Sequence, residues 1–175
     1  MSYPMSHFEI RPATPDDCAL VMHFICRLAD YEKLLSEVTG TEDDVRRELF
    51  GENAIVRAAI AYEGETPVGF ALYFFNFSTF LTRRGLYLED LYIEPEYRGK
   101  GYGKALIEYL AREAVKNGCG RFEWAWSGMN RLSVFIRESV PRLCRTGVCA
   151  ESQVMRLNVW RKQGKIDYGL TGFGA

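Results

Sequence analysis

The spacing of apolar residues in the first third of the chain predicts two helices. In the first, apolar residues recur at the three- and four-residue steps that gather side chains on one helix face: Leu20, Val21, Phe24, Ile25 and Leu28. We expect this helix to begin after Thr14, because a capping threonine is followed by Pro15 and two acidic residues, which suit the positive end of the helix dipole. Thr41, again followed by acidic residues, predicts the start of a second helix that runs to about Phe50.

Further along, the pattern becomes that of strands. Short polar turns separate three stretches rich in β-branched and aromatic residues, which predict consecutive strands: Val56–Tyr62, Pro67–Phe77 and Gly85–Ile93. We expect one strand before them, over Phe8–Pro12, and one after them, over Arg121–Trp126. Between the last two strands, a helix is expected over Lys104–Lys116, with one apolar face and an Asn-Gly stop. This order predicts an α/β layered fold with a mixed, mostly antiparallel sheet flanked by helices.

Composition narrows the class of protein. The 175 residues fit one domain, and 47% hydrophobic with 26% charged residues is a globular balance that excludes a disordered chain. The longest apolar run, Val68–Phe75, is far shorter than the roughly 20 residues that a membrane span needs. The residues before Phe8 lack the basic flank and apolar core of a signal peptide. Five cysteines without a C-x-x-C motif indicate neither a disulfide framework nor a zinc site, so we expect a reduced, cytoplasmic setting.

The charge of the chain is uneven. The whole sequence has a net charge of −1, but residues 131–175 hold eight basic and three acidic side chains. A basic tail of this kind is either a nucleic-acid-binding arm or a solvated surface. Because it carries no binding motif and no dense block of lysine and arginine, we expect no nucleic-acid partner.

A glycine-rich turn joins the third of the consecutive strands to the following helix. The segment Arg98–Gly103 reads Arg-Gly-Lys-Gly-Tyr-Gly. Glycines let several backbone N–H groups point into one concavity, and the helix N-terminus adds positive character, as do Arg98 and Lys100. A P-loop is excluded, because Ala105 stands where Ser or Thr is needed, and the spacing differs from the G-x-G-x-x-G of dinucleotide-binding folds. Although a lone glycine turn is often only a turn, this context favours a pyrophosphate site.

This turn resembles the acetyl-CoA pyrophosphate loop of the GNAT superfamily of N-acetyltransferases. Four further strings resemble its diamine acetyltransferase subgroup, which includes spermidine/spermine and thialysine N-acetyltransferases: Ile10-Arg-Pro-Ala-Thr-Pro-Asp-Asp, Leu28-Ala-Asp-Tyr-Glu, Tyr87-Leu-Glu-Asp-Leu-Tyr-Ile and Pro95-Glu-Tyr-Arg-Gly. The resemblance covers about residues 8–125 of a single N-acetyltransferase domain. It implies the acyl-CoA N-acyltransferase fold, acetyl-CoA as co-substrate and a homodimer.

The resemblance also implies roles for particular residues. Backbone groups that bind the pantetheine arm of acetyl-CoA would come from Leu91, Tyr92 and Ile93. The pyrophosphate would be held by Arg98, Gly99, Lys100, Gly101, Tyr102, Gly103 and Lys104, and Asn130 would also lie on the cofactor side. The amine pocket would be lined by Tyr31, Glu32, Glu89 and Asp90. The implied reaction is direct attack of a neutral primary amine, from a small cationic substrate such as a polyamine or thialysine, with Glu89 taking up the ammonium proton.

Each of these residues has a plainer interpretation as well. Glu89 and Asp90 could be ordinary charges on the two faces of a strand, and Tyr31 with Glu32 a surface pair at a helix end. The two histidines, His7 and His23, lack metal-ligand spacing and are expected to be structural or exposed.

The same holds for two further kinds of residue. Cys119 has no partner that would make it a nucleophile, so we expect a structural role. Core or dimer contacts, rather than a cofactor site, are expected of the aromatic residues Phe74, Phe75, Phe77 and Phe80.

The family pattern ends at residue 125. The family continues with Trp-Asn-Glu-Pro and then a helix carrying Phe-Tyr, whose tyrosine is the proposed acid for the departing thiolate. Here the chain reads Trp126-Ser-Gly-Met-Asn-Arg, and alignment on Asn130 puts Arg137 in the place of the tyrosine. We identify no final strand in this tail, and therefore expect the sheet to lose an edge element.

We hypothesise that residues 126–175 are an out-of-frame translation. Synonymous codons for Trp126 to Ile136, read from the third base of the first codon, spell Glu-Trp-Asn-Glu-Pro-Ala-Glu-Arg-Phe-Tyr. The alternative is a diverged but genuine C-terminus. Without the tyrosine the chain is expected to turn over weakly, which leaves two rivals to a diamine acetyltransferase: a catalytically impaired acyl-CoA-binding protein and a protein N-acetyltransferase.

Overall fold

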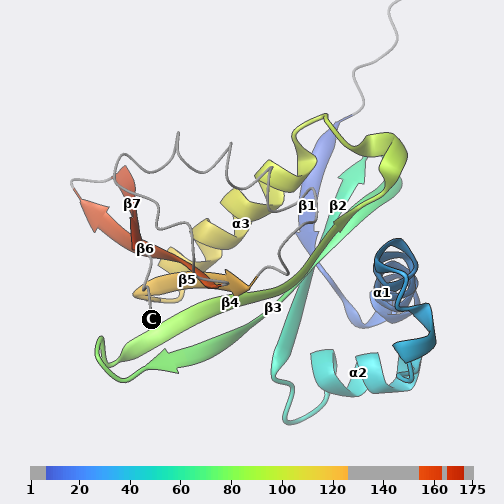
Figure 1. Cartoon of the computed structure of the whole chain (residues 1–175), viewed down its shortest axis with the longest axis horizontal. Helices are drawn as coiled ribbons and strands as arrows, with labels where there is room; N and C mark the ends of the chain where they lie inside the picture. Colours follow the sequence, from blue (N-terminus) through green and yellow to red (C-terminus); the bar gives the residue numbers. More distant parts are fainter. Residues whose placement is uncertain (1–6, 126–153, 163–164, 172–175) are drawn as a thin grey trace, which may run out of the picture. The chain divides into compact units, whose positions relative to one another are not determined.

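The computed structural model describes residues 7–125, 154–162 and 165–171 (Figure 1). They group into two compact units, Met1–Tyr73 with Asp90–Leu106, and Phe74–Glu89 with Ile107–Ala175. Three elements run through both units: β3 (Thr66–Ser78), β4 (Arg83–Ile93) and α3 (Tyr102–Lys116). Strands are hydrogen-bonded in chain order, β1-β2-β3-β4 within the first unit and β3-β4-β5-β6-β7 within the second.

The first unit combines a strand pair with two helices. Strand β1 (Phe8–Pro12) pairs antiparallel with β2 (Val56–Glu63), in a register that sets Phe8 opposite Glu63. The predicted first helix is divided in two, because a 3₁₀ turn at Pro15–Asp17 precedes α1 (Cys18–Glu32). The second predicted helix is α2 (Glu42–Phe50).

Reciprocal hydrogen bonds explain where α2 begins. The backbone N–H of Asp44 donates to the Thr41 hydroxyl at 3.3 Å, and the backbone N–H of Thr41 donates to the Asp44 carboxylate at 2.9 Å. This capping box satisfies helix donors that have no partner within the helix. The hydrogen bonds from the Thr41 side chain and backbone lower the pKa of Asp44 to about 2. The capping-box geometry confirms that the threonine and the acidic residues mark the helix start.

The core of the first unit confirms the apolar face predicted for α1. Val21 and Phe24 are buried against residues of α2, β2, β3 and β4. The Phe24 ring stacks on Phe70 of β3, with 5.5 Å between ring centroids and 13° between the planes, and tilts against Tyr92 of β4 at 6.4 Å. Leu20, Ile25 and Leu28 pack around this cluster.

The second unit adds three strands: β5 (Arg121–Ala125), β6 (Val154–Lys162) and β7 (Lys165–Thr171). Strand β5 is parallel to β4, and its register runs from Gly85 opposite Arg121 to Leu88 opposite Trp124. The pairs β5–β6 and β6–β7 are antiparallel. The prediction of a mixed, mostly antiparallel sheet with helices is therefore confirmed. Helix α3 begins two residues earlier than expected, and its predicted face is fully buried at Leu106, Leu110 and Ala114.

One sequence expectation for this unit is wrong. We identified no strand in the tail, yet β6 and β7 are present, and β6 covers the edge of β5 with Asn158 opposite Arg121. Adjacent apolar pairs interrupt the alternation in Val154–Lys162, so pairing with β5 rather than periodicity identifies this strand. Phe77 and Phe80, for which core or dimer contacts were expected, are 61% and 99% exposed near the β3–β4 turn and are therefore not core residues.

A buried carboxylate in the second unit is neutralised locally. Glu123 of β5 is almost fully buried, and its Oε2 atom lies 2.7 Å from Nε of Arg121. The same oxygen accepts a hydrogen bond of 3.0 Å from the Asn76 side-chain amide on β3. Glu123 is thus a paired structural charge rather than a group available for chemistry.

Replacing Gly69 by alanine should destabilise the protein by about 1–3 kcal/mol, because overpacking displaces well-packed neighbours. A Cβ atom at Gly69 on β3 would collide with the carbonyl oxygen of Tyr92 and with the Ile93 side chain. The backbone of β4 cannot yield as a flexible side-chain end would. Urea denaturation measures the change, with Gly40→Ala as the matched control, since no atom lies within 4 Å of a Cβ there. Equal stability of both variants would contradict the expected close approach.

Candidate functional site

The end of β4 leads directly into the predicted binding loop. Leu91, Tyr92 and Ile93 are its last three residues and are buried. The N–H of Glu94 donates to the carbonyl oxygen of Val68 at 2.9 Å, so β3 accompanies β4 to its end. By contrast, the described pairing of β4 with β5 stops at Leu88.

The glycine loop has the backbone conformation that its sequence requires. After a 3₁₀ turn at Pro95–Tyr97, Gly99 and Gly101 adopt φ angles of 80° and 89°, in the left-handed region. The N–H of Ala105 donates to the carbonyl oxygen of Gly101 at 3.0 Å, which starts α3 at the loop. The first N–H groups of this helix and its dipole are therefore presented at the loop, a favourable setting for an anion.

Arg98 is held at the entrance of the loop. Its Nε donates to the carbonyl oxygen of Ile93 at 2.8 Å. Its guanidinium carbon lies 4.4 Å from the ring centroid of Tyr31 and 5.4 Å from that of Tyr92, within the range of cation–π attraction. Tyr31, predicted to line the amine pocket, thus has one ring face against Arg98.

Lys100 is paired with a residue that the sequence did not single out. Its Nζ lies 3.0 and 3.1 Å from the two carboxylate oxygens of Glu63, at the end of β2. The Tyr102 hydroxyl donates to the same carboxylate at 2.8 Å, and Phe8 stacks on the Tyr102 ring at 4.2 Å. Burial, together with the hydrogen bond to Glu63, raises the pKa of Tyr102. The positive charge of Lys100 is therefore already compensated by the Glu63 carboxylate, whereas Arg98 is not part of this pair.

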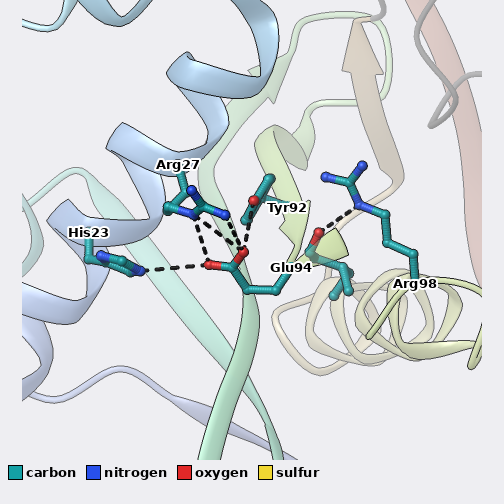
Figure 2. Close-up of polar contacts among 6 residues, drawn as sticks. His23, Arg27, Tyr92, Glu94 and Arg98 are labelled. Carbon is teal, nitrogen blue, oxygen red and sulfur yellow. Dashed lines mark hydrogen bonds and ion pairs between the residues drawn. The ribbon is translucent and has the colours of Figure 1, made fainter. Parts of the chain in front are cut away.

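A buried carboxylate lies between α1 and the loop. Glu94 accepts hydrogen bonds from two N–H groups of Arg27, at 3.1 and 3.2 Å, and from the hydroxyl of Tyr92, at 3.0 Å. Figure 2 shows these contacts as dashed lines. The Nε2 atom of His23 lies 3.6 Å from Oε1 of the Glu94 carboxylate. Burial alone would raise the pKa of Glu94, but the hydrogen bonds from Arg27 and Tyr92 outweigh it and lower the pKa. The hydrogen bond to Glu94 raises the pKa of Arg27 further.

The remaining predicted residues are placed individually. Glu32 is exposed at the end of α1, and Asp90 is half-buried in β4. Glu89 precedes Asp90 and is exposed. Asn130 lies outside the described residues. The structure brings Tyr31 together with Arg98 and Tyr92, and these three belong to the first unit.

Other kinds of site are not found in the described part of the chain. No helix there is long and apolar enough to cross a membrane. Nor does any group of three His, Cys, Asp or Glu side chains among these residues have the arrangement of a metal site. Cys119 is buried, and burial raises its pKa to about 11, which agrees with the structural role expected of it.

Replacing Gly101 by alanine should weaken acetyl-CoA binding about 5- to 30-fold, since a left-handed conformation costs an L-residue about 1–2 kcal/mol. A Cβ atom at Gly101 meets no neighbour within 4 Å, so the effect is conformational rather than steric. Isothermal titration calorimetry measures the dissociation constant. Gly40→Ala, in an equally open position without a positive φ, is the control. An unchanged dissociation constant for Gly101→Ala would show that the loop conformation is not needed for binding.

A comparison with protein families finds a match over most of the chain. The model of the "Acetyltransferase (GNAT) family" matches residues 26–133, which include the end of α1, α2, strands β2 to β5, the glycine loop and α3. The match ends eight residues beyond Ala125, where the family pattern in the sequence ends.

Individual proteins agree with the family match. The chain is 38% identical over 138 residues to thialysine N-epsilon-acetyltransferase of Sus scrofa, covering 74% of this chain and 81% of that protein. It is 37% identical over 203 residues to L-ornithine N5-acetyltransferase NATA1 of Arabidopsis thaliana, covering 86% and 89%. Among solved structures, an integron cassette protein of V. cholerae superposes with a TM-score of 0.64 at 26% identity, covering 92% of this chain and 94% of the other.

Proposed function

This chain belongs to the GNAT family of acetyltransferases, and we propose that it transfers acetyl from acetyl-CoA to the primary amine of a small cationic molecule, a polyamine or a thialysine-like amino acid. Acetyltransferases of the GNAT family use acetyl-CoA as co-substrate. The observation that carries the proposal is the loop of Gly99 and Gly101 between β4 and α3, with left-handed glycines and Arg98 at its entrance. The names of the two relatives support an amine substrate, since they specify the Nε of thialysine and the N5 of ornithine.

The proposed acetyl-CoA contacts fall on two consecutive segments. Backbone groups of Leu91–Ile93 would bind the pantetheine arm, because these residues end β4 immediately before the glycine loop. The segment Arg98–Lys104 would bind the pyrophosphate through backbone N–H groups and the Arg98 guanidinium. Asn130 is proposed as a further contact. When bound, acetyl-CoA supplies the acetyl group as an activated thioester.

The amine side of the proposal rests on carboxylates. Glu89 is exposed, so a cationic substrate can reach its carboxylate. We assign to Glu89 the uptake of the ammonium proton, directly or through one water, which leaves a neutral amine able to attack. Tyr31, Glu32 and Asp90 are the proposed pocket residues; for Tyr31 only the ring face turned away from Arg98 remains available.

The test combines binding with turnover. Acetyl-CoA is titrated by calorimetry, and CoA release is then followed with spermidine, thialysine, ornithine or a lysine-containing peptide as acceptor. We expect binding, and turnover with the small amines. Binding without release of CoA would contradict an enzyme and would mean that the chain is an acyl-CoA-binding protein. Turnover with peptides alone would contradict the proposed substrate class and would mean that the substrates are proteins.

The impaired-enzyme alternative is favoured by one sequence observation. Alignment on Asn130 puts Arg137 in the place of the tyrosine that is the family's proposed acid. Sequencing the coding DNA across codons 120–150 tests whether the tail is out of frame. A shifted frame that spells Trp-Asn-Glu-Pro and Phe-Tyr supports a frameshift, whereas any other reading means that the tail is genuine.

We further propose that residues 1–175 act as one domain, in the cytoplasm, as a homodimer. The described cysteines, Cys18, Cys26 and Cys119, are free thiols, which suits a reducing compartment. Exposed apolar side chains at Phe77, Phe80 and Leu81 provide a surface for a second copy. Sedimentation equilibrium gives the mass in solution, and a monomer at micromolar concentration would refute the dimer.

A further inference from the structure

We infer that Arg27 and Glu94 are positioning residues for acetyl-CoA: their ion pair fixes Tyr92 and, through the Tyr92 ring, the Arg98 guanidinium at the entrance of the glycine loop. The inference rests on the proposed function, because it concerns the residues assigned to the acetyl-CoA site. It adds two residues that neither the sequence nor the family resemblance assigned to that site.

Glu94 is the centre of the arrangement. It is 9% exposed, and a carboxylate buried to this degree needs charged and hydrogen-bonding partners to stay ionised. Arg27 supplies two N–H groups and Tyr92 its hydroxyl (Figure 2). Such charge-assisted hydrogen bonds are shorter and stronger than neutral ones, and two N–H groups from one guanidinium also fix its orientation. Glu94 is therefore held rigidly relative to α1.

Tyr92 passes this constraint on to Arg98. Its hydroxyl is bound to Glu94, and its ring is buried in the core beside Phe24. These contacts fix the position of the Tyr92 side chain, and its ring lies over the Arg98 guanidinium with 5.4 Å between the ring centroid and the guanidinium carbon. The Nε–H of Arg98 is used by the carbonyl oxygen of Ile93, and no hydrogen bond from its Nη groups is found within the described part of the chain. These Nη groups thus remain available to bind phosphate.

Helix α1 contacts this segment at two successive positions. Arg27 and Tyr31 are four residues apart and lie on one face of the helix. Arg27 reaches Glu94, and Tyr31 covers Arg98, which follows Glu94 by four residues. Two contacts spaced in this way resist both sliding and rotation of the 94–98 segment against α1. A salt bridge that served stability alone would not need the second contact at the functional arginine.

The experiment is a double-mutant cycle on acetyl-CoA binding. Calorimetry gives the dissociation constant for the full chain, Glu94→Gln, Arg98→Met and the double variant. Loss of a charge-assisted hydrogen bond should weaken binding by about 10-fold in Glu94→Gln. If Glu94 acts through Arg98, the double variant binds no more weakly than Arg98→Met alone. A purely structural role predicts that the two effects multiply, and an unchanged constant in Glu94→Gln likewise overturns the inference.

Controls separate the possible failures. Arg46→Met breaks the exposed Arg46–Glu42 ion pair on α2, at 3.2 Å, and should leave the dissociation constant unchanged. Should Glu94→Gln fail to fold, Tyr92→Phe removes only the hydroxyl contact and is expected to weaken binding about 3- to 10-fold, as loss of one hydrogen bond does; no change there also refutes the inference. Absence of binding by the unmodified chain overturns the proposed function itself.

Discussion

Replacing Glu89 by glutamine should lower kcat by a factor of about 10²–10⁴ with spermidine or thialysine as acceptor, the usual cost of losing a proton-transfer group. Glutamine keeps the size and hydrogen-bonding shape of the side chain but cannot take up the ammonium proton. The dissociation constant for acetyl-CoA should stay the same, because the proposed contacts with that ligand come from Leu91–Ile93 and Arg98–Lys104. Steady-state kinetics and calorimetry on the same preparation measure both quantities.

Glu65→Gln is the matched control for this variant, since it removes an exposed carboxylate from the turn between β2 and β3. Its kcat should equal that of the unmodified chain. If the Glu89→Gln enzyme retains more than about a fifth of the original kcat, Glu89 does not take up the proton in the reaction. The interpretation as an ordinary strand charge would then be the correct one.

Replacing Phe24 by alanine should destabilise the protein by about 3–5 kcal/mol, the range found when a buried phenylalanine is truncated. The ring is 1% exposed and contacts Phe70 and Tyr92, so its removal leaves a cavity between α1 and the sheet of the first unit. Urea denaturation followed by fluorescence gives the free energy of unfolding. Such a loss is a large part of the stability of a small protein.

Ile55→Ala is the control for Phe24, because Ile55 is also apolar but 70% exposed. Its free energy of unfolding should change by less than about 0.5 kcal/mol. Similar losses for the two variants would contradict the position of the core. A loss below 1 kcal/mol in Phe24→Ala would do so as well.

Local patterns predicted much of the fold. The spacing of Val21 and Phe24 identified the buried face of α1, and Thr41 marked the start of α2, because both depend on residues within one or two turns. The strands β6 and β7 were missed for the opposite reason. Adjacent apolar pairs interrupt the alternation in β6, and β7 is a seven-residue segment that does alternate but was not identified as a strand. The pairing of β6 with β5 and with β7 identifies both.

In the candidate site, too, local features could be predicted from the sequence and long-range contacts could not. The glycine loop was predictable, since Gly99 and Gly101 take left-handed conformations that their own residue type permits. The pair Arg27–Glu94 joins residues 67 positions apart, and Lys100–Glu63 joins residues 37 apart. No spacing rule connects such positions, and each residue alone reads as a surface charge. Only the packing of α1 and β2 around the end of β4 shows that they are partners.

The Glu63 carboxylate also affects which anions the loop accepts. Because Glu63 contacts Lys100 within the same unit, its effective concentration at the ammonium group is on the order of millimolar or higher. A small inorganic ion, such as phosphate or sulfate, must compete with a tethered anion for a single contact. A diphosphate ester that also meets the N–H groups of the loop and the N-terminus of α3 has several contacts to offset that competition. The pairing of Lys100 thus favours ligands anchored at many points over the abundant simple anions of the solution.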